Sequence, residues 1–361
     1  MNEALLLQGA DVDPVRVRIG DEAVPGFADE RARTHMQTPA YGTLLRKLGQ
    51  DTRWITVSRG DRTLASWLVF VGPLDFQRPP ASLVSRAVDR HLHAVHGPVL
   101  DPDLDPPTRA LVRDASLAAL RRMAARLRPV TVTARLDPML DDDAREGWVR
   151  AAQAGGWHAD RTQTWAALLP DDEEEMFRRI SRERRRKVRK AERGGGTIDV
   201  RADAEALREY YDVRCETFAR NDIPAIGWPH FISTLEALAP AGVMTILLSR
   251  FGDRVGAAQL AFAHRGYVVL VGVAVADWAL ADRRAANELL QWGVLRWAIA
   301  QGHQVVDFVG ANSGSSDPKL LAIDAFKSRW GTSLHDSLTL SIPGSRVRAK
   351  AAGAARRLPI G

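Results

Sequence analysis

Residues 252–309 read GDRVGAAQLAFAHRGYVVLVGVAVADWALADRRAANELLQWGVLRWAIAQGHQVVDFV. A Gly-Asp turn between two apolar runs is a hairpin signal. The residues that follow predict a strand at Tyr267–Ala274, a helix at Arg283–Ala300 and a second strand at Val305–Val309. Because a helical crossover joins parallel neighbours, this order predicts a mixed sheet with a parallel central pair.

The same order of elements occurs earlier in the chain. Residues 58–70 read SRGDRTLASWLVF, and Gly60-Asp61-Arg62 matches Gly252-Asp253-Arg254 at an offset of 192. A strand near 92–96, a helix near 108–127 and a strand near 130–134 are expected to follow. The chain is therefore predicted to contain two lobes of the same α/β architecture. Further matches at this offset pair Ala65, Leu68 and Phe70 with Ala257, Leu260 and Phe262.

The length of 361 residues also favours two domains. We expect an N-terminal lobe at 1–170, a basic connecting helix at 171–198, a C-terminal lobe at 199–342 and a basic tail at 343–361. Neither a dinucleotide-binding fingerprint nor a P-loop is present, because the glycines at 194–196 follow a predicted helix rather than a strand.

A concentrated positive charge lies in residues 177–193, FRRISRERRRKVRKAER, which hold ten basic and two acidic residues for a net +8. The whole chain is only +6, so everything else sums to −2. Phe177, Ile180, Val188 and Ala191 form an apolar stripe, which predicts an amphipathic helix that ends at the glycines. The charged face is either a polyanion site or a solvated surface. The residues predicted to bind nucleic acid or another polyanion are Arg185, Arg186, Arg189 and Lys190.

Several functional classes are excluded or disfavoured by the composition. Cys215 is the only cysteine, so an intrachain disulfide and a thiolate zinc site are excluded. His91, His93 and His96 lie on a predicted strand, which does not converge three ligands, so no metal is expected. No apolar run is long enough for a signal peptide or a membrane span. We therefore expect a soluble, cytoplasmic protein.

The segment ANELLQWGVLRWAIAQGHQVVDFVGANSG, from residue 286, and the later AFKSRWG, from residue 325, resemble Fem-type (FemABX) aminoacyl transferases. These proteins belong to the acetyltransferase-like (GNAT) superfamily and are built from two tandem lobes. The His96–Val99 segment and the R-x-x-x-R-K-A-E-R run at 185–193 are similar to the family's N-terminal lobe and interlobe element. The resemblance covers residues 30–342 and implies two tandem GNAT-like lobes joined by a long basic helix.

The resemblance implies transfer of an aminoacyl group from aminoacyl-tRNA to an acceptor amine, which forms a peptide bond. The implied partners are aminoacyl-tRNA and a small-molecule or peptide acceptor that can be phosphorylated, without a cofactor or integral membrane contact. One alternative is an acyl-CoA-dependent N-acyltransferase acting on a sugar or small metabolite. Another is a non-catalytic protein that binds RNA or other anions on the same scaffold. The fold does not choose among these functions.

Three residues are the candidate catalytic group. Lys327 and Phe326 form the F-K pair of the motif, and the resemblance places the lysine near the reacting carbonyl, where a cation stabilises an oxyanion. Asp307 ends an apolar strand at the edge where α/β proteins bind ligands. The alternatives are a surface position for Lys327 and a loop-capping role for Asp307.

Further candidates are cations expected to bind phosphates. Arg220 resembles the family's arginine for the acceptor's phosphates, and Lys47 falls near its N-terminal lysine, although Arg46 fits as well. The predicted helix at 283–300 opens with Arg283, Arg284 and Asn287, which can meet a phosphate at the helix N-terminus. No glycine lies between residues 277 and 291, which disfavours the backbone grip on pyrophosphate used by acetyl-CoA enzymes. Each cation can also be a solvated surface residue.

Overall fold

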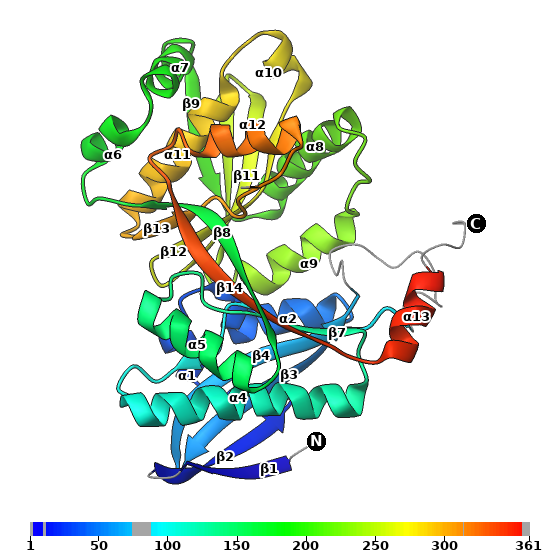
Figure 1. The fold of residues 1–361 in the computed structure, drawn as a ribbon. Helices are drawn as coiled ribbons and strands as arrows, with labels where there is room; N and C mark the ends of the chain where they lie inside the picture. The colour runs from blue at the N-terminus through cyan, green and yellow to red at the C-terminus, as the bar shows by residue number, and fades with distance from the viewer. Residues whose placement is uncertain (1–2, 10–11, 74–87, 313, 356–361) are drawn as a thin grey trace. The chain divides into compact units, whose positions relative to one another are not determined.

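A computed structural model of the chain describes residues 3–9, 12–73, 88–312 and 314–355. The chain forms two compact units, unit 1 with residues 1–162 and 336–361, and unit 2 with residues 163–335. Each unit is a mixed sheet with helices on its faces (Figure 1). The predicted α/β class with two tandem lobes is confirmed.

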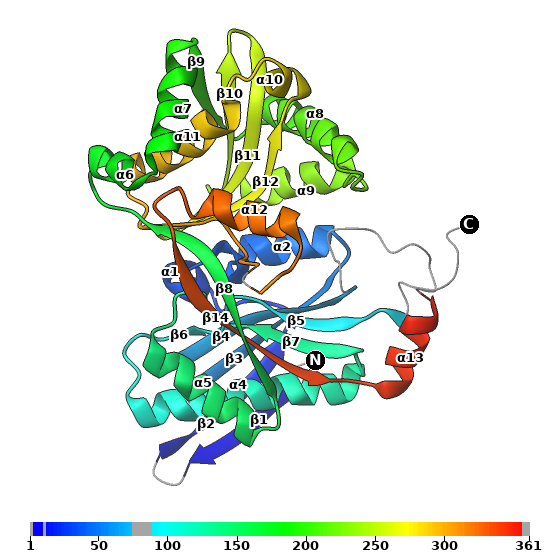
Figure 2. The same ribbon diagram turned by 45° about the horizontal axis from the view of Figure 1, so that its top comes forward.

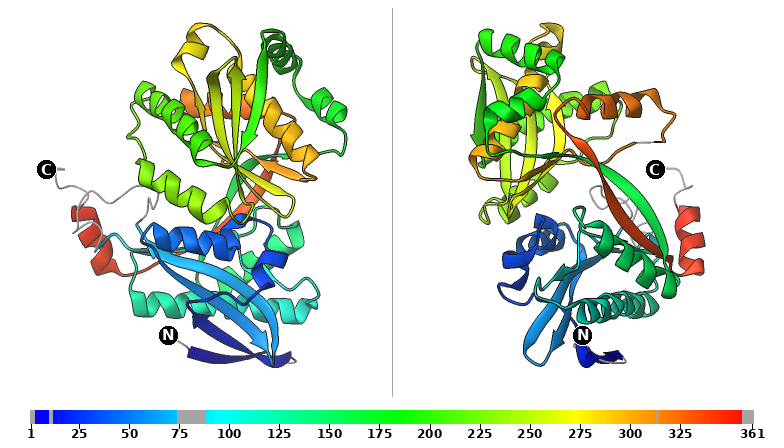
Figure 3. Two further views of the ribbon diagram at one scale, coloured as in Figure 1. Left: turned by 180° about the vertical axis from the view of Figure 1, so that it is seen from behind. Right: turned by 60° about the vertical axis from the view of Figure 1, so that its left-hand side comes forward.

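Unit 1 has the strand order β1-β2-β3-β4-β5-β7-β14, with β6 paired to β4. Helices α4 and α5 lie on one face of the sheet, and α1 and α2 lie on the other (Figure 3). The strands are β1 (Glu3–Gly9), β2 (Val12–Gly20), β3 (Asp51–Arg59), β4 (Arg62–Gly72), β5 (His91–Ala94), β6 (Val99–Leu100), β7 (Thr131–Arg135) and β14 (Ser333–Pro343). The helices are α1 (Phe27–Arg31), the 3₁₀ helix η1 (His35–Gln37), α2 (Pro39–Lys47), α4 (Pro106–Leu127), α5 (Asp142–Ala154) and α13 (Arg346–Ala355).

Unit 2 has the strand order β8-β13-β12-β11-β10-β9. Helix α11 covers one face together with α6 and α7, and α8 and α9 cover the other (Figure 2). The strands are β8 (His158–Leu168), β9 (Gly196–Arg201), β10 (Met244–Phe251), β11 (Arg254–His264), β12 (Tyr267–Val275) and β13 (Val305–Asp307). The helices are α6 (Glu173–Arg179), α7 (Arg182–Arg193), α8 (Ala204–Arg220), α9 (Trp228–Leu238), α10 (Asp277–Ala281), α11 (Ala286–Ala300) and α12 (Pro318–Lys327).

The two sheets are completed by exchanged strands. Strand β8 follows the unit 1 helix α5 in sequence, yet its last residues, 166–168, pair with β13 of unit 2. Strand β14 follows the unit 2 helix α12, yet residues 339–343 pair with β7 of unit 1. Each unit therefore needs a strand that chain order would assign to the other.

The internal repeat is present in the structure, and the two hairpins share the position at which the strand register shifts. Gly60 and Gly252 form the hairpin turns with φ of 56° and 63°, a left-handed conformation that glycine adopts without steric cost. The β3–β4 register shifts between Val57 and Ser58, and the β10–β11 register shifts between Ser249 and Arg250. Both shifts fall at the same offset of 192, since 249 minus 57 is 192.

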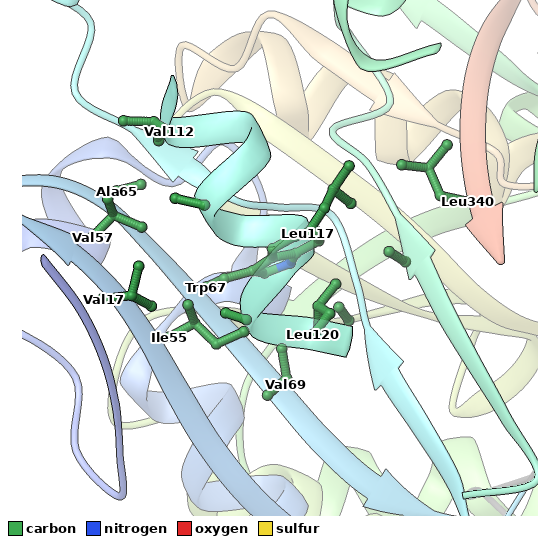
Figure 4. Close-up of a cluster of buried hydrophobic side chains, with 14 of the residues drawn as sticks. Val17, Ile55, Val57, Ala65, Trp67, Val69, Val112, Leu117, Leu120 and Leu340 are labelled. Atoms are coloured by element: carbon green, nitrogen blue, oxygen red, sulfur yellow. The ribbon is translucent and has the colours of Figure 1, made fainter. Parts of the chain in front are cut away.

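The core of unit 1 lies between the sheet and helices α4 and α5. Trp67 from β4 is fully buried and lies beside Leu117 and Leu120 of α4 (Figure 4). Its ring meets Trp148 of α5 edge-on at 6.1 Å between centroids. Leu340 of the exchanged strand β14 is part of the same buried cluster. The exchange therefore supplies core packing as well as backbone hydrogen bonds.

The basic segment differs in one respect from the single amphipathic helix expected between residues 177 and 193. It forms two helices, α6 and α7, separated at Ile180, whose backbone is extended with ψ 142°. Ser181 then caps α7 by accepting a hydrogen bond from the backbone N–H of Arg184, which starts a new helix. The predicted end at Gly194 is confirmed.

The basic tail expected at 343–361 begins at the last residue of β14 and continues as α13 up to Ala355. Its residues 356–361 lie outside the described part of the chain. Among the described helices, none is both long and apolar enough to cross a bilayer.

Candidate active site

The candidate site lies where the parallel strands of unit 2 separate. Strands β12 and β13 pair at only three positions, and the last pair is Val269 with Asp307. Strand β12 continues to Val275, whereas β13 ends at Asp307. The carboxyl end of such a pair is where α/β sheets usually bind ligands.

Asp307 is a buried carboxyl group, with 3% of its surface exposed. Its oxygens accept hydrogen bonds from Thr164 Oγ1, from the Tyr267 hydroxyl at 2.6 Å and from the Val309 backbone N–H at 2.8 Å. Burial raises the pKa of Asp307, and these three donors oppose the rise. The predicted position at the end of the strand is correct, and the side chain braces the loop that follows it.

Lys327 ends α12 and reaches the same loop. Its Nζ donates to the carbonyl oxygens of Val309 and Gly310, the second at 2.7 Å. Burial lowers the pKa of Lys327, while the negative charges of Asp324 and Asp307 raise it. An ammonium has three N–H donors. The third has no acceptor among the described residues, so it is free for a bound oxygen.

Val309 is held from both sides by these two residues. Its N–H donates to Asp307 and its carbonyl accepts from Lys327. Its φ is 48°, a left-handed conformation that is a true outlier for a β-branched residue. Such strain costs about 1–3 kcal/mol and persists only where the surroundings hold it, which is common at functional sites. The expected strand 305–309 ends at residue 307 for this reason.

Phe326 contributes packing behind Lys327. The Arg184 guanidinium lies 4.7 Å from the centre of its ring, and the Trp330 ring centre lies 5.9 Å away. Arg184 also donates to Glu288 on α11, so Phe326 is packed beneath a buried ion pair. The position fits a residue that orients the end of α12.

The start of α11 is a tight loop without a side-chain cap. Arg283 and Ala285 have φ of 54° and 57°, and the helix begins at Ala286. A Cβ on Gly256 would lie 2.8 Å from the Ala286 Cβ, so the start of the helix packs closely on β11. Asn287 accepts a hydrogen bond from Gln291 at 3.3 Å. Arg284 lies on the surface and forms an ion pair with Asp282 at 3.6 Å.

The remaining predicted phosphate ligands lie elsewhere. Arg220 forms an ion pair with Asp277 and donates to the Val275 carbonyl at 3.1 Å, which ties α8 to the end of β12. The next residue, Asn221, accepts from Lys319 Nζ at 3.1 Å, so the end of α8 lies beside the start of α12. Lys47 is the last residue of α2 in unit 1 and is exposed.

Four residues around the site were not found from the sequence. They are the two hydroxyl donors to Asp307 and the ion pair behind Phe326. The chain separations of 143 residues between Thr164 and Asp307, and 104 residues between Arg184 and Glu288, leave no local signal of contact. The four residues are Thr164, Tyr267, Arg184 and Glu288.

The three histidines do not form a ligand set. His91 bonds to Thr131 and Asp89, and His93 contacts the Pro73 carbonyl. Burial lowers the pKa of His93 and of His96 to about 4. Across the described residues, no group of three acidic, histidine or cysteine side chains is placed to hold a metal ion.

Comparison with known proteins supports the fold assignment. Residues 177–328 match a family model described as an acetyltransferase (GNAT) domain, which is less than half of the chain. No curated protein sequence shows significant similarity.

Solved structures resemble nearly the whole chain. A structure of FemX superposes with a TM-score of 0.70 at 14% identity and covers 87% of this chain and 94% of that one. The structure of L-PGS from Bacillus licheniformis gives 0.57 at 14% identity, with coverage of 93% and 98%. A domain described as part of a lysylphosphatidylglycerol synthetase from Agrobacterium fabrum gives 0.57 at 14%, with coverage of 91% and 94%. At these identities, the likeness establishes a GNAT-like tandem fold.

Proposed function

We propose that the chain is an aminoacyl transferase, which moves an aminoacyl group from aminoacyl-tRNA to an acceptor amine. The observation that supports this most is the convergence of Lys327 and Asp307 on the strained Val309–Gly310 loop, at the open end of the parallel pair. A cation with one free donor at such an opening suits a reaction that develops an oxyanion.

The proposed reaction needs no cofactor besides the two substrates. The acceptor nitrogen attacks the ester carbonyl carbon and forms the new C–N bond. The carbonyl oxygen becomes an oxyanion, which Lys327 stabilises through its free N–H. When the intermediate collapses, the ester C–O bond breaks and the ribose oxygen leaves with the proton lost by the amine. Positioning of the two substrates provides much of the rate.

Asp307 is proposed to act as a positioning residue. It does not reach the surface, and its hydrogen bond to the Val309 N–H fixes the loop whose carbonyls orient Lys327. The proposed phosphate contacts remain Arg220, Lys47, Arg283, Arg284 and Asn287. Arg220 and Arg284 would first have to leave their acidic partners.

The test is transfer from a mixed pool of charged tRNA to candidate amines, with and without ribonuclease. We expect ribonuclease to abolish transfer and Lys327→Ala to reduce it by about 100-fold or more, the scale of losing one oxyanion donor. Lys319→Ala is the matched control, because Lys319 is an exposed lysine at the other end of α12. Retained turnover in a folded Lys327→Ala protein would disprove the role of the lysine.

A second candidate is an acyl-CoA-dependent N-acyltransferase, which the match to an acetyltransferase model favours. The absence of glycine at the α11 turn disfavours it. Saturable acyl-CoA turnover that resists ribonuclease would establish this function in place of the first. Binding of RNA without turnover of either donor would instead support the non-catalytic alternative.

A further inference from the structure

The charges of α7 are divided between two faces with different partners. Arg184 is 8% exposed and donates to Glu288, and Lys187 Nζ reaches the same carboxylate at 3.1 Å. Val188 on that side belongs to the core of unit 2, and Ala191 is buried as well. This inward face attaches α7 to α11, so only the outward face is available for a ligand.

The outward face consists of arginines that have no acidic partner. Arg182, Arg185, Arg186 and Arg193 have no carboxylate within 4.0 Å in the described part of the chain, whereas other arginines of unit 2, such as Arg250, are ion-paired. The four residues follow one helix face over about 16 Å. They line an open pocket of about 700 Å³ together with Arg189 and Glu183. The outward face of α7 therefore carries positive charge that no carboxylate of the described residues neutralises.

A second pocket of about 390 Å³ adjoins the first, since Arg185 and Arg189 line both. Aromatic side chains form part of its wall, with the Phe177 and Trp292 ring centres 4.7 Å apart. The Arg189 guanidinium lies 5.3 Å from the centre of the Phe177 ring. The lining thus combines planar groups and cations. It also contains three carboxylates, those of Glu173, Glu174 and Glu192.

We propose that these two adjoining pockets form an RNA subsite, an inference that rests on the proposed use of an RNA-linked donor. The arginines of the outward face bind successive phosphates, because a guanidinium matches phosphate oxygens with two parallel hydrogen bonds. The smaller pocket holds one unpaired base, stacked on the Phe177–Arg189 pair. Glu173 and Glu174 have basic partners at 2.7 and 3.9 Å, whereas Glu192 has none within 4.0 Å among the described residues. Glu192 accepts a hydrogen bond from an exocyclic amino group, so the pocket selects the bases that carry one, adenine, cytosine and guanine, over uracil.

The chemistry of α7 favours RNA over an anionic membrane surface. A helix that lies in a membrane interface inserts an apolar face beside its cations. Every exposed residue of α7 is charged, and its apolar residues Val188 and Ala191 are buried in the protein. The aromatic rings of the smaller pocket can stack on a planar base, whereas a phospholipid headgroup offers no planar ring for stacking.

The test measures binding of uncharged tRNA to the full chain as a function of salt, so that it does not depend on catalysis. The variant Arg182→Gln/Arg186→Gln/Arg193→Gln is compared with Arg121→Gln/Arg122→Gln/Arg126→Gln on α4, which removes the same charge from another helix. We expect the α7 variant to bind about tenfold or more weakly and to lose about 2 from the slope of log K against log salt. The α4 variant should bind like the wild type.

The base pocket is tested with short oligonucleotides. We expect wild type to prefer oligo(A) or oligo(C) over oligo(U), and Phe177→Leu to lose the preference while it keeps the salt slope. Equal losses in both triple variants, or unchanged binding in the α7 variant, would overturn the proposal. So would stronger binding to phosphatidylglycerol vesicles than to RNA. Because Lys327→Ala should bind RNA normally, failure of the subsite and failure of the transferase assignment give different results.

Discussion

The two units differ most at the ends of their parallel strand pairs. In unit 2 the pairing starts at Tyr267 with Val305 and ends at Asp307. In unit 1 it starts at Leu92 with Val132 and ends at Ala134. The places of Tyr267 and Asp307 are thus taken by a leucine and an alanine, both fully buried. The same fold holds a hydrogen-bonded carboxyl group in one unit and apolar packing in the other.

Unit 1 also fills the space beside its strand pair. The Gln37 side chain accepts from the Leu68 N–H at 2.8 Å and donates to the carbonyls of Leu68 and Val95. A Cβ on Gly97 would lie 2.5 Å from Trp67 and 2.9 Å from Gln37, so no room is left. At this position unit 1 is therefore filled by packed side chains, whereas unit 2 holds the hydrogen-bonded Asp307.

The largest effect is expected when unit 1 receives the carboxylate of unit 2. Ala134→Asp would bury a charge with Leu92 in place of the tyrosine donor. An uncompensated buried charge costs several kcal/mol, of order 3–5 kcal/mol. We expect a large fall in the midpoint of thermal unfolding measured by circular dichroism.

Ala134→Val is the control, because it adds volume without charge and should cost about 1–3 kcal/mol from overpacking. If Ala134→Asp is no less stable than Ala134→Val, unit 1 supplies hydrogen-bond donors to a carboxylate at this position.

The next largest effect is expected in unit 2 at Arg184, which links α7, α11 and Phe326. Arg184→Met removes one partner of a buried ion pair and leaves Glu288 with only Lys187. Breaking a buried pair costs about 3 kcal/mol, measured as the free energy of unfolding in denaturant. The double variant Arg184→Met/Glu288→Leu should recover much of it. Equal stability of the single and double variants would show that the pair is not coupled.

Local signals account for the parts of this molecule that sequence could predict. The Gly-Asp turns, the alternating strands and the helical crossovers are set by neighbouring residues, and the repeat at offset 192 reinforced them. The exchange of β8 and β14 could not be predicted. The residue pattern of a strand, such as that of residues 162–168, does not determine which other strand it pairs with. The F-K motif located Lys327. The strained Val309 could not be foreseen, since contacts from two other elements hold it.

A smaller loss of stability is expected when Gln37, which fills the space beside the strand pair of unit 1, is replaced. Gln37→Ala leaves the Leu68 N–H and the Val95 carbonyl without their side-chain partner, which costs about 1–3 kcal/mol of unfolding free energy. Gln37 belongs to unit 1, whereas Asp307 and Lys327 belong to unit 2. The KM and kcat of transfer should therefore stay at wild-type values at a temperature where the variant is folded. A selective change in KM would show that the surroundings of Gln37 also contact substrate.

The smallest effect is a change in slope with pH at Asp307. Its folded pKa is raised above the ordinary value of 3.8, so the native state holds this proton more tightly than the unfolded chain. The stability that this group contributes is complete below pH 3.8 and is lost as pH rises through the folded pKa. Asp307→Asn removes the titration but keeps an oxygen for Thr164 and Val309. We expect a flatter plot of unfolding free energy against pH in this window, measured by urea titration. A plot that matches wild type would mean that the three donors fully offset burial, and that Asp307 is charged at the bottom of this site in the same way as a surface carboxylate.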